Sequence, residues 1–440
     1  MEFPPGVSPP CTAICRSLSL LILASFPVWR PSVIAADASP YLSVTAGPLL
    51  IRPQFSISQG LSDNLFSNPD RIGDSVTVLG TGFELQVGKA FGNFAVFDYS
   101  VGQRLYAAHR DLDGTDHSLT LGINYRLAKV SFAASESVQF LNQPIGSVLE
   151  GRTEQPSSGG ATDEPGPPSV PSAPPSVGET FVRLPAASIR RMAHSGNYSL
   201  AYALTDKTRL YLQASHELLA YQARIDLLDH QTMRGVLGYN YQAFPRTSLF
   251  GEFSVGRTTS EPNAQVADQP SSIFFGGSLG VRGRFTERIS GELKLGYEAR
   301  TFGDLLATPD YPVFGATVSY QASPKRNFAL SLGRAQDISS QYAESSYSHS
   351  TVNLRVNQSI GSARKWSASA GGTFSRYDYS GAGGSSQNYD RYEAALSLRY
   401  QIQLWLAANM SYSFGAIRRH SSEADNYNAN QINLSFEVGY

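Results

Sequence analysis

The C-terminal stretch Arg391–Tyr440 alternates between apolar and polar side chains along three successive segments. In the middle segment, small or polar side chains alternate with apolar ones at Leu406, Ala408, Met410, Tyr412 and Phe414. Because successive side chains on a strand point to opposite faces, a period of two predicts a sheet with one apolar and one polar face.

The same alternation recurs in about eighteen segments between Leu49 and Tyr440. The connections between segments alternate in length: Ala128–Lys129 is short, whereas Ala107–Asp116 is long and polar. Short turns at one end and long loops at the other are the layout of bacterial outer-membrane barrels. We therefore predict an all-β fold, a transmembrane antiparallel up-and-down β-barrel of about 18 strands, with 16 as the alternative count, short periplasmic turns and long extracellular loops.

Composition supports a membrane sheet over a soluble one. Charged residues make up 16% of the chain, against about 25% in ordinary globular proteins. Apart from the first thirty positions, no run of about 18 apolar residues could form a membrane-spanning helix. A soluble β-sandwich is the alternative, but about seven to nine strands suffice for one. The net charge of −1 gives no basic surface for nucleic acid, so no nucleic-acid partner is expected.

The N-terminal region has the pattern of a secretory signal. Arg16 precedes an apolar stretch, and small residues follow at Ala35 and Ala36, so we predict a signal peptide over 1–36. Both cysteines lie within it, which excludes disulfides and thiol chemistry from the mature chain. Residues 37–48 are expected to form a short periplasmic segment, and residues 49–440 the outer-membrane barrel. A Pro-rich loop over 144–185 interrupts it, since proline cannot donate to a strand ladder.

The segment Gln59–Asp70 carries the sequence Asp63-Asn64-Leu65-Phe66 before a polar loop. It resembles the first outer loop of a family of outer-membrane beta-barrel porins that are often encoded beside exopolysaccharide genes. The resemblance implies location in the outer-membrane lipid bilayer, and exopolysaccharide export components as partners.

The last strand is similar to the signal by which the barrel-assembly machinery recognises its substrates, so that machinery is an expected partner. The residues that carry this similarity are Ile432, Leu434, Phe436, Val438 and Tyr440. We expect the last strand to pair with the first, Ile51–Gln59, and so to close the ring, because a sheet exposed to lipid must have no free edge.

Charged side chains at inward positions are the candidate functional residues, because charges on the lipid face are unfavourable. They are Arg126, Arg234, Arg282, Arg284, Glu292, Lys294, Arg355 and Arg399. Two interpretations are open. The charges form ion-pair ladders along the lumen, or the arginines make a periplasmic mouth that attracts anions such as acidic saccharides.

Other motifs point to no chemistry. His194 and Ser195 are adjacent, so on a strand they face opposite sides and cannot form a base–nucleophile pair. Asp111-x-Asp113-Gly114-x-Asp116 lacks the later bidentate Glu of a calcium loop. We expect no catalytic residues, no metal site and no cofactor.

The function predicted from the sequence is a porin-like channel for small polar solutes or a share in exopolysaccharide export. The alternatives are a non-conducting structural or surface-anchoring barrel and an outer-membrane lipid hydrolase.

Overall fold

The computed structural model describes ten ranges of the chain: 43–88, 92–144, 188–222, 229–261, 271–302, 310–338, 345–361, 365–381, 388–421 and 426–439. The predicted signal peptide, residues 145–185 of the predicted Pro-rich loop and Tyr440 lie outside these ranges, whereas Pro144 is the last residue of strand 130–144. Within them, no helix is both long and apolar enough to cross a membrane.

Nearly all regular structure in these ranges is β-strand, as the alternation predicts. The strands are β1 (Val44–Ala46), β2 (Leu49–Ser62), β3 (Asp74–Gly88), β4 (Phe94–Tyr106), β5 (Gly114–Arg126), β6 (Val130–Pro144), β7 (Ser188–Ala203), β8 (Thr208–Tyr221), β9 (Asp229–Phe244), β10 (Thr247–Glu261), β11 (Ser272–Arg284), β12 (Ile289–Phe302), β13 (Asp310–Ser323), β14 (Arg326–Ile338), β15 (Ser345–Ile360), β16 (Trp366–Gly381), β17 (Tyr389–Gln403), β18 (Leu406–Arg419) and β19 (Tyr427–Val438). One 3-10 turn, η2 (Arg110–Leu112), lies between β4 and β5.

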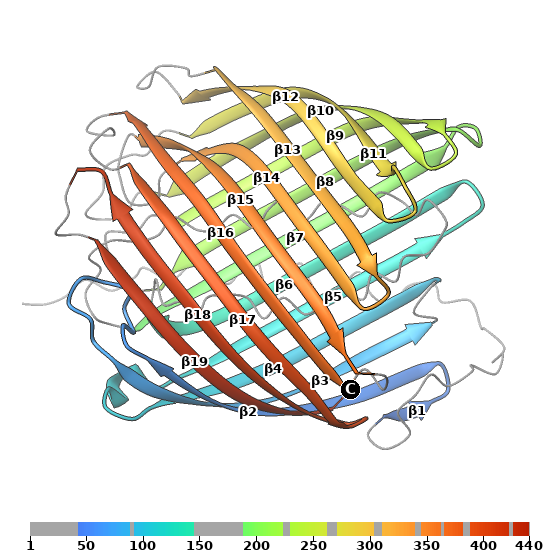
Figure 1. The fold of residues 1–440 in the computed structure, drawn as a ribbon. Coiled ribbons are helices and arrows are strands. Elements are labelled where there is room, and N and C mark those ends of the chain that lie inside the picture. Colours follow the sequence, from blue (N-terminus) through green and yellow to red (C-terminus); the bar gives the residue numbers. More distant parts are fainter. Residues whose placement is uncertain are drawn as a thin grey trace, which may run out of the picture. The chain divides into compact units, whose positions relative to one another are not determined.

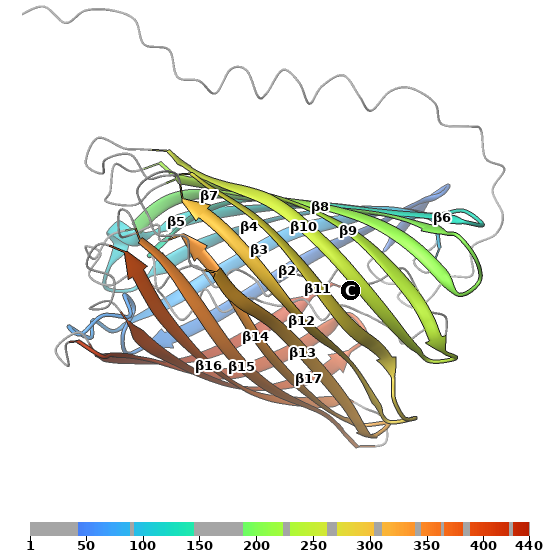
Figure 2. The ribbon, with the colours of Figure 1, turned by 90° about the horizontal axis from the view of Figure 1, so that it is seen from above.

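Each strand from β2 to β19 pairs antiparallel with its neighbours in sequence, and β19 pairs with β2. The result is a closed ring of 18 strands that run obliquely round a barrel (Figures 1 and 2). The closing register runs from Gln431 opposite Ser62 to Val438 opposite Phe55. The predicted fold class and the pairing of the last strand with the first are confirmed.

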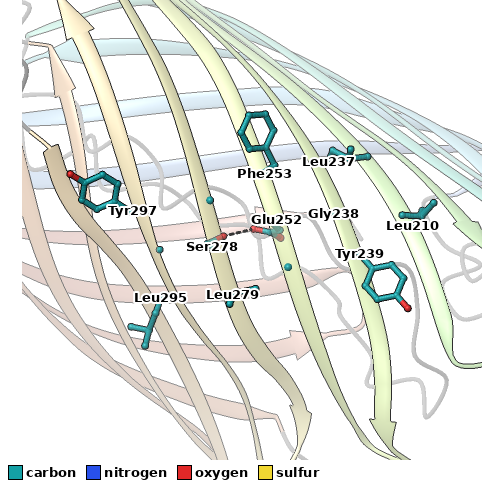
Figure 3. A pocket seen from close by; sticks show the side chains of 13 residues that line it. Leu210, Leu237, Gly238, Tyr239, Glu252, Phe253, Ser278, Leu279, Leu295 and Tyr297 are labelled. Atoms are coloured by element: carbon teal, nitrogen blue, oxygen red, sulfur yellow. Dashed lines mark hydrogen bonds between the residues drawn. The ribbon is translucent and has the colours of Figure 1, made fainter.

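The outer face of the barrel is apolar and exposed, the reverse of a soluble protein. Leu279, Leu295 and Phe253 have 73%, 59% and 55% of their surface exposed. Figure 3 shows a pocket lined by residues of β8–β12, most of them apolar and exposed on this face; Glu252 and Ser278, which also line it, share a hydrogen bond. A closed sheet satisfies its backbone internally, so it can present such a surface to lipid.

The strands are longer than the alternation indicated. The first strand was predicted to end at Gln59, but β2 extends to Ser62. A membrane crossing needs only about 9–11 residues. The ladders continue past that length because each strand still has a partner on both sides. The sequence did not predict β1. This short strand pairs with the start of β2, from Leu49 to Ile51.

The Asp63–Phe66 motif ties the first loop to the closing strand. The Asn64 side-chain amide donates to the carbonyls of Asn68 (2.7 Å) and Asn428 (2.9 Å). Asp63 accepts hydrogen bonds from the backbone and side-chain nitrogens of Asn430 at 2.6 and 2.7 Å. Leu65 and Phe66 are buried in a small apolar cluster with Val76, Tyr106 and Leu112. In this chain the motif therefore holds the seam and folds the first loop over the inner wall of β3 and β4.

Candidate functional site

The inner wall of β8, β10, β11 and β12 carries one connected group of charged and aromatic side chains. Glu252 lies at its centre. It accepts hydrogen bonds from the Tyr211 hydroxyl (2.7 Å) and the Lys294 ammonium (2.5 Å). Arg282 donates to the Tyr211 hydroxyl at 3.2 Å and lies 3.8 Å from the Glu292 carboxylate. We call these residues the lower group. Its two acids, Glu252 and Glu292, balance the charges of Lys294 and Arg282.

Glycines on neighbouring strands let the aromatic rings of this wall lie flat. A Cβ at Gly238 would fall 2.0 Å from the Tyr211 ring, and one at Gly280 would fall 2.3 Å from the Phe250 ring. The rings occupy that space and are almost completely buried. The Arg282 guanidinium then stacks over Phe250, 4.1 Å from the ring centroid. Stacking and ion pairing together hold this arginine against the wall.

A second, upper group lies nearer to the end with the longer loops. Glu298 bridges Arg234 (3.1 Å) and Arg300 (3.3 Å), and Arg300 also lies 3.6 Å from Asp337 on β14. Both arginines lie over the Phe274 ring, at 5.2 and 4.5 Å from its centroid. This group repeats the design of the lower one, with an aromatic ring against the wall and ion-paired arginines above it.

Four of the predicted inward residues take part in ion pairs in these groups: Arg234, Arg282, Glu292 and Lys294. A fifth, Arg399 of β17, pairs with Glu437 of β19. The pattern within single strands did not predict these partners. Lys294 of β12 meets Glu252 of β10, and Arg234 of β9 meets Glu298 of β12, so the partners lie two or three strands apart.

The other three predicted residues lie at different points of the wall. Arg126 ends β5 and its side chain is exposed; within the described residues, no ion pair to it is found. Arg284 ends β11, where its backbone N–H donates to the Arg246 carbonyl at 2.8 Å. Arg355 of β15 is exposed and faces Ala329 and Gly371 across its neighbouring strands. These three therefore lie outside both groups described above.

An arginine that the sequence analysis did not name joins Arg126 at the short-turn end. Arg209, near the start of β8, lies within electrostatic reach of Arg126 and Arg282. The three guanidinium groups come from β5, β8 and β11. Their sequence separation concealed the cluster, and only the rule that short turns share one end of a barrel could have indicated it.

In the acidic motif Asp111–Asp116, two of the carboxylates already have hydrogen-bond or ion-pair partners within the protein. Asp113 accepts a hydrogen bond from the Tyr106 backbone at 2.7 Å, and Asp116 pairs with Arg104 at 2.5 Å. These carboxylates hold the ends of β4 and β5 together. Asp116 lies within β5, and Asp113 lies directly before that strand.

A closed antiparallel ring with an apolar outer face and a charged inner wall defines a channel of the outer membrane. The chain belongs to the family described as "Putative beta-barrel porin 2", whose model matches residues 201–440. It is thus a porin-like outer-membrane β-barrel, as the resemblance at Gln59–Asp70 implied. Family membership points to a channel rather than an enzyme.

Solved outer-membrane structures of similar architecture share little sequence with this chain. Pseudomonas aeruginosa OccK11 (OpdR) is 14% identical, with 89% of this chain and 96% of that chain covered and a TM-score of 0.42. The outer membrane protein opdK of the same organism is 10% identical, covering 89% and 99% at a TM-score of 0.43. Pseudomonas aeruginosa OccK5 (OpdH) is 10% identical, covering 89% and 98% at 0.45. No curated protein sequence matches the chain.

Proposed function

We propose that the barrel is a diffusion channel for small polar solutes, with a periplasmic mouth that favours anions. The observation that carries the proposal is the cluster of Arg126, Arg209 and Arg282 at the short-turn end. Arg282 is partly neutralised by Glu292, but Arg126 is exposed and has no ion pair within the described residues. Arginine presents forked donors to carboxylates, so acidic saccharides are the solute class that this mouth suits.

The two groups on the wall of β8–β12 support a different role for the remaining charges. Their acids and bases balance, and their arginines are stacked on buried rings. They line and stiffen the wall without adding net charge. Both interpretations of the inward charges therefore apply, the ion-pair ladder to these groups and the anion-attracting mouth to the cluster around Arg126.

Reversal potentials in planar bilayers under a KCl gradient test this proposal. The wild-type channel is expected to prefer chloride, and Arg126→Gln combined with Arg209→Gln should reduce that preference. The matched control is Arg399→Gln with Glu437→Gln, which removes an ion pair outside this cluster without changing the net charge and should leave selectivity nearly unchanged. Cation selectivity of the wild-type channel would overturn the proposal.

The geometry of β7 favours a channel over a lipid hydrolase. His194 and Ser195 are consecutive in this strand, so they point to opposite faces. The family resemblance also supports a share in exopolysaccharide export, with the export components as partners. Deleting the gene should then lower secreted polysaccharide without affecting its synthesis, and unchanged secretion would contradict that share.

A further inference from the structure

Three side chains with metal-binding atoms meet on the outer face of the barrel: Glu136 of β6, His194 of β7 and His216 of β8. Glu136 and His216 both lie opposite Gly196 in the strand register, and His194 is two residues from that glycine. Further along the same face, Leu200 and Leu212 are 45% and 53% exposed. The three side chains therefore lie on the lipid-facing side, where the sequence analysis expected no charge.

The donor atoms of these side chains form a compact triangle. His194 Nε2 lies 2.9 Å from Glu136 Oε2 and 3.2 Å from His216 Nε2, and His216 Nε2 lies 3.7 Å from Glu136 Oε2. Zinc bonds of about 2.0–2.2 Å at tetrahedral angles place ligand atoms about 3.3–3.6 Å apart. The triangle thus matches three corners of a zinc tetrahedron after shifts of a few tenths of an ångström.

Two neighbouring residues, Tyr198 and Gly196, help to hold these three side chains in place. The Tyr198 hydroxyl donates to Glu136 Oε1, which orients the carboxylate and leaves Oε2 towards the histidines. Such an outer hydrogen bond to a ligating carboxylate is typical of metal sites. Gly196 lies beneath, and a Cβ there would fall 2.3 Å from His216 Cε1 and 2.7 Å from Glu136 Oε1. Glycine at this position leaves the room in which the two side chains approach each other.

The surroundings make an uncompensated carboxylate unfavourable. Val138 and Leu218 lie on the same face towards the long loops, and Leu200 and Leu212 lie towards the short turns. Ionisable groups at membrane depth usually pair with one another and mark functional sites. A divalent cation would satisfy the carboxylate and both imidazole nitrogens at once. The side chains retain 21–32% exposure, so neighbouring side chains do not close off the three ligand atoms.

We propose that Glu136, His194 and His216 bind a divalent transition-metal ion, zinc first, and so link β6, β7 and β8 at the lipid-facing surface. Two imidazoles and one carboxylate suit zinc, copper and nickel better than magnesium or calcium. Three protein ligands leave the fourth zinc position open. No sequence spacing indicates this site, because its ligands come from three strands.

The test uses the full chain, folded in detergent and carrying no polyhistidine tag. Titration calorimetry with zinc chloride should show one site per chain. His194→Gln and His216→Gln should each weaken zinc binding by more than the roughly 10–100-fold that loss of an outer-shell partner costs. His117→Gln is the matched control: His117 lies on the same face, opposite the exposed Phe140, and its ring nitrogen bonds the Tyr99 hydroxyl at 2.9 Å. It should bind zinc as the wild type does.

Gel mobility before and after heating shows whether each variant has folded. Electron paramagnetic resonance of the wild-type barrel with one equivalent of Cu²⁺ needs no variant and should show two coordinated nitrogens. A wild-type protein that binds no zinc, histidine variants that bind as tightly as wild type, or a copper spectrum without nitrogen ligands would each overturn the proposal.

Discussion

At the scale of single residues, Glu252 shows how the lumen wall keeps a charge in place. Only 8% of its side chain is exposed, yet both oxygens have donors, from Tyr211 on one side and from Lys294 and Ser278 on the other. A buried carboxylate is tolerated when such partners replace water. Removing one partner therefore costs more than the ion pair itself contributes.

Replacing Lys294 with methionine tests this interpretation. Glu252 would keep Tyr211 but lose its ammonium partner, so the free energy of unfolding should fall by about 1–3 kcal/mol. Urea unfolding in lipid vesicles, followed by tryptophan fluorescence, measures the change. Adding Glu252→Gln to the variant should restore part of the loss, because the uncompensated charge is then gone.

The control for this prediction is Arg376→Gln. Arg376 pairs with Asp378, but 50% and 41% of these side chains are exposed, and pairs exposed to solvent contribute little. No measurable change in unfolding is expected. Equal losses in the Lys294 and Arg376 variants would contradict the view that the lumen network, rather than charge pairing in general, stabilises the wall.

The alternation of residues indicated the face on which Arg282, Glu292 and Lys294 lie, since parity along a strand decides it. It did not indicate their partners. Glu136, His194 and His216 are a clearer example of contacts that the alternation of residues cannot predict. Each is polar at an outward position, and their meeting depends on the register of β6, β7 and β8, which the sequence of a single strand does not contain.

At the scale of elements, the seam between β19 and β2 completes the barrel. Its ladder spans only Gln431–Val438, and β1 continues it at the other end of β2. Asp63 and Asn64 add side-chain bonds to Asn430 and Asn428. Within the described residues, the seam is thus the shortest ladder of the closed ring.

Deleting residues 436–440 removes the pairs that Phe436 and Val438 make with Ile57 and Phe55. The shortened β19 should no longer close the ring, and open edges are not tolerated in lipid. We expect the truncated chain to remain in the periplasm, extractable by urea and unchanged in gel mobility on heating. The same deletion also tests the proposed recognition by the barrel-assembly machinery, and normal surface assembly would contradict both.

Strand existence and order were predictable because each strand repeats the same two-residue period. Strand ends were not, as β2 shows by extending to Ser62 instead of ending at Gln59. Beyond Gln59, the backbone of β2 keeps pairing with β3 and β19 as far as Ser62. The three-residue β1 is too short to carry a period at all.

At the scale of the whole molecule, a porin-like channel requires an open, water-filled lumen inside the closed ring. A ring of 18 strands is wide enough for an aqueous channel. The charged groups lie flat against the wall of β8–β12 rather than across the lumen. Small polar solutes should therefore diffuse through.

Liposome swelling measures that passage directly. Vesicles that contain the purified barrel should swell in isosmotic solutions of small sugars, at rates that fall as the sugar becomes larger. Vesicles with heat-unfolded protein should not swell. A diffusion channel should give monosaccharide swelling well above this background, and a correctly folded barrel that passes no sugar would rule out such a channel.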